Sequence, residues 1–359
     1  MHFLGWDGFF ESQNLGLLSP AWRPARVICE ERGLYRVQFS ETDMRWACVS
    51  GKMQFNADGR ESYPAVGDWV LVDTPNPHDR GVIHGVYPRK TVIQRKQAGT
   101  AGGMQILAAN VDTIFITTSL NEDLNHRRLE RYLVMAWESG CTPVILLTKA
   151  DLCADTGDVE AAVWDAQRTF PGVDVHALSQ ANFAQAEFFA AYLEVGKTAV
   201  VVGSSGVGKS TLVNYLIDDD RIRTQAIRED DARGRHTTTS RALYVSRFGG
   251  LVIDTPGMRE LQLADHEEGV SAQFADIEEW AQSCRFNDCQ HDTEPDCAVK
   301  SARANGELGE DRWASYLKLA AEVRFEMRKQ DKALASEQRK LWKKRSKEAA
   351  QRSKSKRGG

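Results

Sequence analysis

The stretch Gly203-Ser204-Ser205-Gly206-Val207-Gly208-Lys209-Ser210 matches a phosphate-binding loop at every required position. It follows the β-rich run Thr198–Val202 and precedes a helical pattern that Thr211 begins, which is the context such a loop needs. The glycines let backbone N–H groups point at phosphates. Lys209 would neutralise the β and γ phosphates, and the Ser210 hydroxyl would bind Mg²⁺. An ordinary glycine-rich turn would need all these residues to coincide in this context.

Two segments downstream of this loop fit the switches of a nucleotide-dependent protein. Asp254-Thr255-Pro256-Gly257 ends the apolar run Leu251–Ile253, so Asp254 could hold Mg²⁺ through water while the Gly257 amide senses the γ phosphate. Between the two lies Gly234–Thr239, which is flanked by charges and lacks apolar periodicity. We expect a first switch there, with Thr238 completing the Mg²⁺ shell. The alternative for this segment is an ordinary polar loop.

A separate motif addresses the choice of base. Thr148-Lys149-Ala150-Asp151 follows the strand-like run Val144–Leu147 and resembles the Asn-Lys-x-Asp guanine reader of GTPases. The Asp151 carboxylate can accept two hydrogen bonds from guanine, and adenine offers no such donor pair. Thr148 replaces the usual Asn, which weakens one expected hydrogen bond to the base or the loop. The run Val175–Ser179 is a poorer candidate for a second base-contacting loop.

The order of these motifs predicts a circularly permuted domain. Apolar strand-like runs and helical stretches alternate from about Ala108 onward, which favours a parallel sheet with helices on its faces. The base reader comes before the phosphate loop, whereas in ordinary GTPases it follows. Such a permutation is tolerable because chain termini often lie close together. The second switch therefore becomes the last element and leads directly into the C-terminal region.

The N-terminal region has a different rhythm. Five short strand-like runs separated by turn signals occupy about seventy residues, which fits a small barrel of the oligonucleotide-binding (OB) type. An SH3-like barrel would give a similar pattern. The expected strands are Ala25–Glu30, Leu34–Phe39, Arg45–Val49, Gly67–Asp73 and Gly81–Val86.

A metal motif follows the last predicted strand. Cys284-x4-Cys289-x-His291-x5-Cys297 places three thiolates and one imidazole within fourteen residues. This is a closed tetrahedral set for one structural Zn²⁺, with no position left for a catalytic water. The segment is poor in apolar residues, so we expect the metal to supply folding energy on the order of 10 kcal/mol. The alternative is a chance cluster of reduced cysteines. A helix with apolar residues at Trp313, Tyr316, Leu317 and Ala320 is expected after it.

Composition sets the broad class. Hydrophobic residues make up 42% and charged residues 27% of the 359 residues, as in an ordinary globular protein. No apolar run is long enough to cross a bilayer, and the first residues do not form a secretory signal. The seven cysteines are scattered except for the three of the metal motif, which suits a reducing cytosol with one metal site. From residue 322 onward there are 14 Lys or Arg and 5 Asp or Glu, against 32 and 45 in the rest. This basic end could bind a polyanion or could be a solvated tail.

Taken together, the chain resembles the RsgA (YjeQ/YloQ) family of circularly permuted GTPases of small-ribosomal-subunit biogenesis. The residues that carry the likeness are Thr148–Asp151, Gly203–Thr211, Gly234–Thr239, Asp254–Gly257 and the Cys₃His motif. The resemblance implies GTP hydrolysis stimulated by the small ribosomal subunit during its late maturation, contacts to rRNA, and a cytoplasmic location. Nothing in the sequence demands more than a monomer.

The same resemblance implies a multidomain architecture. We expect an OB-fold barrel, a central α/β permuted phosphate-loop GTPase domain, and a small zinc-binding α domain with a basic tail. The expected boundaries are an N-terminal extension at 1–24, the barrel at 25–100, the GTPase domain at 101–263, the zinc domain at 264–321 and the tail at 322–359.

Hydrolysis itself raises an open question. Ras-like enzymes place a water-orienting Gln after the glycine of the second switch, but this chain has Met258 there. Intrinsic turnover should therefore be slow, with Lys209 stabilising charge and His236 as a candidate to position the water. His236 could equally contact RNA or be a plain loop residue. A rival interpretation is an RNA-binding module with a structural nucleotide site; a small-molecule kinase is disfavoured by the base reader.

Overall fold

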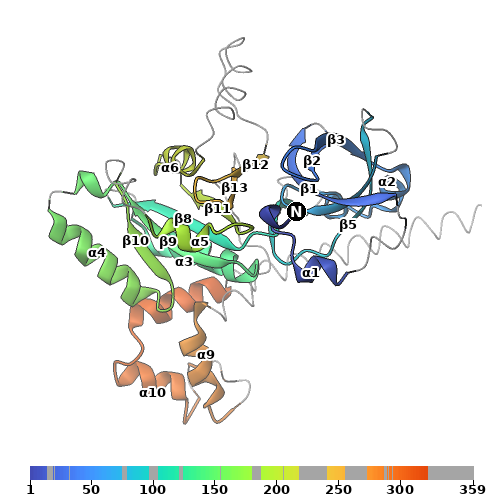
Figure 1. Ribbon diagram of the computed structural model, residues 1–359. Coiled ribbons are helices and arrows are strands. Elements are labelled where there is room, and N and C mark those ends of the chain that lie inside the picture. The colour runs from blue at the N-terminus through green and yellow to red at the C-terminus, as the bar shows by residue number, and fades with distance from the viewer. Residues whose placement is uncertain are drawn as a thin grey trace, which may run out of the picture. The chain divides into compact units, whose positions relative to one another are not determined.

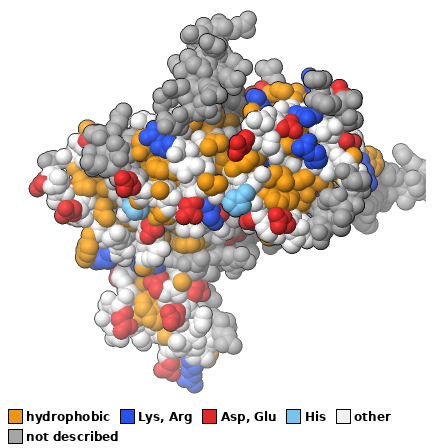
Figure 2. Space-filling model, viewed as in Figure 1, with side chains coloured by type: hydrophobic (Ala, Val, Ile, Leu, Met, Phe, Trp, Pro, Cys, Tyr) orange, Lys and Arg blue, Asp and Glu red, His pale blue; other side chains and the backbone are white. Residues whose placement is uncertain are grey.

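In the computed structural model, the chain forms two compact units, Met1–Gln262 and Leu263–Gly359, and each is described by itself (Figure 1). No described helix is long and apolar enough to span a membrane. On the face shown in Figure 2, acidic and basic side chains are interspersed over the described parts of the surface. The described residues are 1–13, 19, 21–31, 33–74, 79–96, 104–120, 124–153, 155–179, 187–204, 206–217, 241–254, 273–286, 289, 291–292 and 294–321.

Five strands near the N-terminus close into a barrel. They run in the order β1-β2-β3-β5-β4, and β4 pairs back to β1. Strand β3 is parallel to β5, and the other neighbours are antiparallel. A five-stranded Greek-key barrel of this kind is the OB type, so the predicted barrel is confirmed. Its elements are β1 (Trp22–Glu31), β2 (Leu34–Gln38), β3 (Met44–Val49), α2 (Gly51–Asn56), η3 (Arg60–Ser62), β4 (Trp69–Asp73) and β5 (Gly81–Val86).

The barrel core follows from the alternation of apolar residues along its strands. Val27, Val37 and Ile83 are fully buried in one cluster with seven other side chains from the barrel. The first residues of the chain pack outside this cluster, as η1 (His2–Leu4) and α1 (Gly8–Glu11). There Leu4 and Phe10 are buried, and the Trp6 ring makes an edge contact with Trp69 at 4.8 Å between centroids. The N-terminal segment is thus part of the first unit's core.

The predicted parallel sheet is also confirmed. Its strand order is β10-β9-β8-β11-β13-β12, and only β12 is antiparallel to its neighbour β13. The strands are β8 (Thr113–Ser119), β9 (Thr142–Thr148), β10 (Asp174–Ala177), β11 (Thr198–Gly203), β12 (Arg241–Val245) and β13 (Leu251–Asp254). The helices around it are α3 (His126–Glu138), η4 (Ala150–Leu152), α4 (Thr156–Thr169), α5 (Phe189–Tyr192) and α6 (Lys209–Leu216).

Helices cover both faces of this sheet. Successive residues of the buried strands point to opposite faces, so Val200 and Val202 pack with α3 and α4, whereas Val201 packs with α5 and α6. Strand β12 also pairs antiparallel with β1, which joins the parallel sheet and the barrel into one 11-stranded sheet. A hairpin of β6 (Val92–Lys96) and β7 (Met104–Ala109) lies between them in the sequence.

The regular elements described in the second unit are helices. This unit contains α9 (Ala275–Gln282), α10 (Ala298–Ala304) and a helical segment over residues 310–321. Arg312 on that segment makes an ion pair with Asp276 of α9 at 2.7 Å. Trp313 is buried and stacks on Tyr316 at 5.4 Å between ring centroids, as expected for an apolar stripe. The expected helix is therefore present, although Leu317 is 41% exposed.

Candidate nucleotide site and metal cluster

The phosphate loop connects the end of β11 to the start of α6. Gly203 and Gly208 have φ values of 148° and 94°, which L side chains rarely adopt. A Cβ at Gly203 would lie 2.2 Å from the carbonyl oxygen of Thr117, so this position also excludes a side chain by contact. Thr117 of the neighbouring strand β8 therefore packs directly against the start of the loop. The sequence motif did not reveal this contact.

The side chains that would meet phosphate lie at the first turn of α6. Lys209 begins this helix, and its ammonium group donates a hydrogen bond to the carbonyl oxygen of Ser204. Ser210 is exposed, Thr211 is half-buried and Val207 is buried. A helix N-terminus with free backbone N–H groups favours an anion at this point. Ser205 lies outside the described residues.

The base-reader motif is attached to the phosphate loop. The buried Thr148 hydroxyl lies 2.7 Å from the carbonyl oxygen of Val207 and 3.2 Å from that of Thr118. Because a hydroxyl carries one proton, the nearer Val207 oxygen is the better acceptor. Thr148 thus contacts the loop although it is shorter than the Asn it replaces. The signal that could have revealed this is the hydroxyl itself, since it retains a donor.

The rest of the motif meets the loop that follows β10. Lys149 has a left-handed φ of 59°, and Ala150 and Asp151 lie in η4. The Ala150 N–H donates to the carbonyl oxygen of Leu178 at 3.0 Å, and the Leu178 N–H donates to Leu147 at 2.7 Å. The structure therefore brings together the base reader and the second predicted base-contacting run.

Asp254 lies at the end of the neighbouring strand. It is the last residue of β13, which runs parallel to β11. It therefore lies at the carboxyl ends of the strands, as the phosphate loop does. Burial raises the pKa of Asp254 above its usual range. A nearby cation would favour the charged carboxylate and oppose this shift. Gly257, Met258 and the predicted first switch with His236 and Thr238 lie outside the described residues.

The second unit contains one cluster of metal-ligating side chains among its described residues. The ligand atoms of Cys284, Cys289, His291 and Cys297 all lie within 4.8 Å of one another. The Cys284 and Cys297 sulfurs are 3.8 Å apart, and His291 Nδ1 lies 3.5 Å and 3.4 Å from them. The Cys297 sulfur also accepts the Lys300 N–H at the start of α10. The four predicted residues therefore form a set that could hold a metal ion.

The chain is similar in sequence to proteins of one known family. The family model described as RsgA GTPase matches residues 86–264. The chain is 45% identical to the small ribosomal subunit biogenesis GTPase RsgA 1 of Oceanobacillus iheyensis over 89% of this chain and 90% of that protein. It is 41% identical to RsgA of Opitutus terrae, over 95% and 94% of the two chains.

Two solved structures share the fold. YjeQ from Thermotoga maritima matches with a TM-score of 0.63 and 28% identity, over 84% of this chain and 98% of that one. YloQ, described as a circularly permuted GTPase, matches with a TM-score of 0.61 and 26% identity, over 84% and 95%. The predicted permuted architecture is therefore confirmed.

Proposed function

The chain belongs to the RsgA GTPase family, and on that premise we propose that it acts in the maturation of the small ribosomal subunit. Membership makes it a GTP-hydrolysing enzyme. The relatives are named as small ribosomal subunit biogenesis GTPases, and they match along nearly their whole length. The proposal includes stimulation of GTP hydrolysis by the small ribosomal subunit.

The contact between Thr148 and Val207 supports the nucleotide-binding part of the proposal. It joins the motif that would read guanine to the loop that would hold phosphate, across 59 positions of sequence. One nucleotide could then contact both motifs, with Asp151 on the base and backbone N–H groups of 203–208 on the phosphates. The permuted order of the motifs does not separate them in space.

The roles of the site residues follow from their chemistry. Lys209 would neutralise the β and γ phosphates, while Ser210, Thr238 and Asp254 would bind Mg²⁺. The Gly257 amide would sense the γ phosphate. Met258 cannot orient water, so His236 or a ribosomal group would have to do so. Because the second switch lacks a water-orienting side chain, the isolated protein should hydrolyse GTP slowly.

Zinc is the metal that best fits the Cys₃His cluster. Zn–S bonds of about 2.3 Å and Zn–N bonds of about 2.1 Å in a tetrahedron separate two sulfurs by about 3.8 Å and a sulfur from a nitrogen by about 3.6 Å. The corresponding separations here are 3.8 Å between Cys284 and Cys297, and 3.5 Å and 3.4 Å from these sulfurs to His291. One structural Zn²⁺ would complete the folding of this unit.

The partner would be ribosomal RNA of the small subunit. The OB barrel belongs to a class that binds oligonucleotides, and the basic stretch at 322–359 would add attraction to phosphates. The boundaries at 1–24, 25–100, 101–263, 264–321 and 322–359 belong to the same proposal. A monomer in the cytoplasm satisfies all of these roles.

GTP turnover by the full chain tests the proposal, measured alone, with isolated small subunits and with large subunits, and with ATP in place of GTP. We expect a large increase only with GTP and small subunits. Tight RNA binding in every nucleotide state without stimulated turnover would contradict it. That result would favour an RNA-binding module whose nucleotide is structural.

A further inference from the structure

A cavity in the first unit lies away from the nucleotide site. Its volume is about 470 Å³, within the range of small-molecule pockets. The N-terminal segment walls one side, and the other side includes Thr113, Thr142 and Lys197, at or just before the amino ends of β8, β9 and β11. The phosphate loop and base reader lie at the opposite, carboxyl ends of these strands. A ligand here would not overlap the nucleotide.

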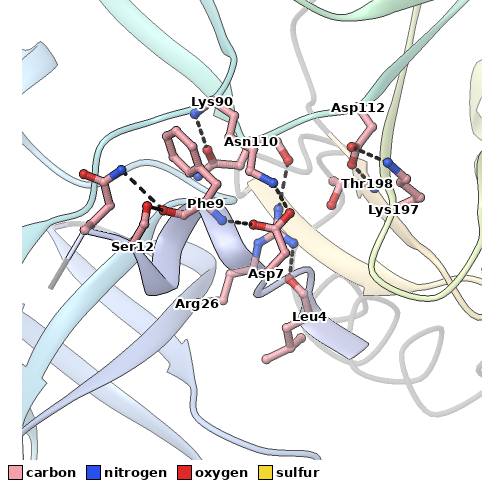
Figure 3. Close-up of polar contacts among 11 residues, drawn as sticks. Leu4, Asp7, Phe9, Ser12, Arg26, Lys90, Asn110, Asp112, Lys197 and Thr198 are labelled. Atoms are coloured by element: carbon pink, nitrogen blue, oxygen red, sulfur yellow. Dashed lines mark hydrogen bonds and ion pairs between the residues drawn. The ribbon is translucent and has the colours of Figure 1, made fainter. Parts of the chain in front are cut away.

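A fully buried guanidinium lines this cavity. Arg26 donates from Nε to Gly67 O at 3.1 Å, from Nη2 to Asn110 O at 3.0 Å, and from Nη1 to Leu4 O (Figure 3). These bonds occupy three of its five N–H donors. All three acceptors are backbone carbonyls, and no carboxylate of the described residues lies within ion-pair distance of Arg26.

The nearest carboxylates are engaged by other cations. Asp68 makes an ion pair with Arg89 at 2.7 Å. Asp112 makes an ion pair with Lys197 at 3.2 Å and accepts the Thr198 N–H at 2.9 Å. Burial lowers the pKa of the Arg26 guanidinium to about 10, so it stays charged at neutral pH. A buried charge with no carboxylate in contact is costly. Asp112 and Asp68 offset part of that cost from a distance, and an anion in the cavity would offset more of it.

The other charged groups of the wall leave a positive balance. Lys90 pairs with Asp7, and Lys197 pairs with Asp112 (Figure 3). Three cations therefore face two carboxylates, a net charge of +1 with His2 neutral. Three aromatic side chains complete the wall, Trp6, Phe10 and Tyr192.

Arg26 also ties together three segments of chain, and this structural role accounts for its three carbonyl bonds. It leaves two N–H donors of Arg26 without a hydrogen-bond partner among the described residues, in a side chain that lines the cavity. We propose that this cavity binds a small molecule bearing an oxyanion, a phosphate or a carboxylate, with a flat ring against the aromatic wall. A guanidinium suits such a group because it can donate two parallel hydrogen bonds.

The test is calorimetric titration of the full chain, with GDP and Mg²⁺ saturating so that the nucleotide site is filled. The probes are inorganic phosphate, adenosine monophosphate and benzoate, which separate the type of anion from the contribution of the ring. We expect one saturable equivalent, with adenosine monophosphate tighter than phosphate. Arg26 is left intact because its carbonyl bonds hold the fold together.

Two variants should move the affinity in opposite directions. Lys197→Gln lowers the net charge of the wall to zero, and we expect about tenfold weaker binding. Asp7→Asn raises it to +2 and still caps α1, so we expect tighter binding by a similar factor. Lys52→Gln, on the exposed surface of α2, is the matched control and should change nothing.

Absence of saturable binding by all three probes would overturn the proposal. Equal affinities in the wild type, Lys197→Gln and Asp7→Asn would also overturn it, because the probe would then be bound elsewhere. Preference for phosphate or for benzoate identifies which oxyanion the cavity takes. None of these results depends on GTP turnover, so they are independent of the function proposed above.

Discussion

The Thr148 hydroxyl lies 2.7 Å from the carbonyl oxygen of Val207, and it thereby links the base-reading motif to the phosphate loop. Both groups are buried, so their hydrogen bond is shielded from water. The link places two motifs from distant parts of the chain in one site. Removal of this hydrogen bond should lower the affinity for guanine nucleotide.

Thr148→Val keeps the shape of the side chain but leaves the Val207 carbonyl without this donor. A lost buried hydrogen bond costs about 1 kcal/mol or more, so GDP affinity should fall by roughly fivefold or more. Titration with a fluorescent guanine nucleotide measures this. Thr148→Ser retains the hydroxyl and serves as the control. Equal affinities for the two variants would show that the contact has no role in binding.

Lys209→Ala should reduce GTP turnover in the presence of small subunits by at least about a hundredfold, because it removes positive charge from the phosphates. Phosphate release is the measurement, and Lys52→Ala is a control on the exposed surface of α2. Stimulated hydrolysis that survives in Lys209→Ala would refute the site assignment.

Gly203→Ala should destabilise the first unit by about 3 kcal/mol and abolish GDP binding. The added Cβ would lie 2.2 Å from the Thr117 carbonyl oxygen, at a φ of 148° that alanine rarely adopts. Urea unfolding gives the free energy. Gly85→Ala is the comparison, since a Cβ added at Gly85 would meet no atom within 4 Å beyond its chain neighbours. A similar loss in both variants would contradict the steric explanation.

Cys297→Ser should lower the bound zinc from one equivalent to near zero and unfold the second unit's described helices in part, because the metal contributes folding energy. Elemental analysis and circular dichroism follow the two effects. Cys153→Ser lies outside the cluster and should keep its zinc. A full equivalent of zinc in Cys297→Ser would exclude this ligand set.

His176 should make stability depend on pH. Burial against Phe188, at 3.9 Å between stacked ring centroids, lowers the pKa of His176 below 6.5, although Asp174 acts in the opposite direction. The unfolded chain therefore binds a proton first as the pH falls through 6.5, and stability declines below that pH. His176→Phe should reduce the decline between pH 7.5 and 5.5, as measured by urea midpoints. An unchanged pH dependence would argue against this origin.

The sequence predicted most of the fold because its signals are local. Each barrel strand has a short apolar run bounded by turn residues, and the observed bounds of the five barrel strands differ from the expected ones by three residues at most. Strands β10 and β12 of the parallel sheet were not predicted. The helix expected around Trp313 is present, but helical periodicity does not tell whether a neighbouring element covers an apolar position, and Leu317 is exposed.

The candidate site was predictable where chemistry demands particular residues at set spacings. The phosphate loop, the base reader and the Cys₃His motif are of this kind, and the four metal-ligating side chains do converge in space. The support of Gly203 by Thr117 was not predictable in the same way. It depends on the register between β8 and β11, which pairs Gly203 with Thr117.

By itself, the sequence determined the family, the permuted order of the motifs and the residues available to bind nucleotide and metal. Tertiary structure alone decided that Thr148 reaches Val207, that Leu4 and Phe10 are buried, and that Arg26 meets carbonyls from three separate segments. The physical reason is the distance along the sequence over which the interactions act. Motifs and periodicities record interactions between near neighbours, whereas these contacts join residues distant in sequence and exist only once strand register and packing are set.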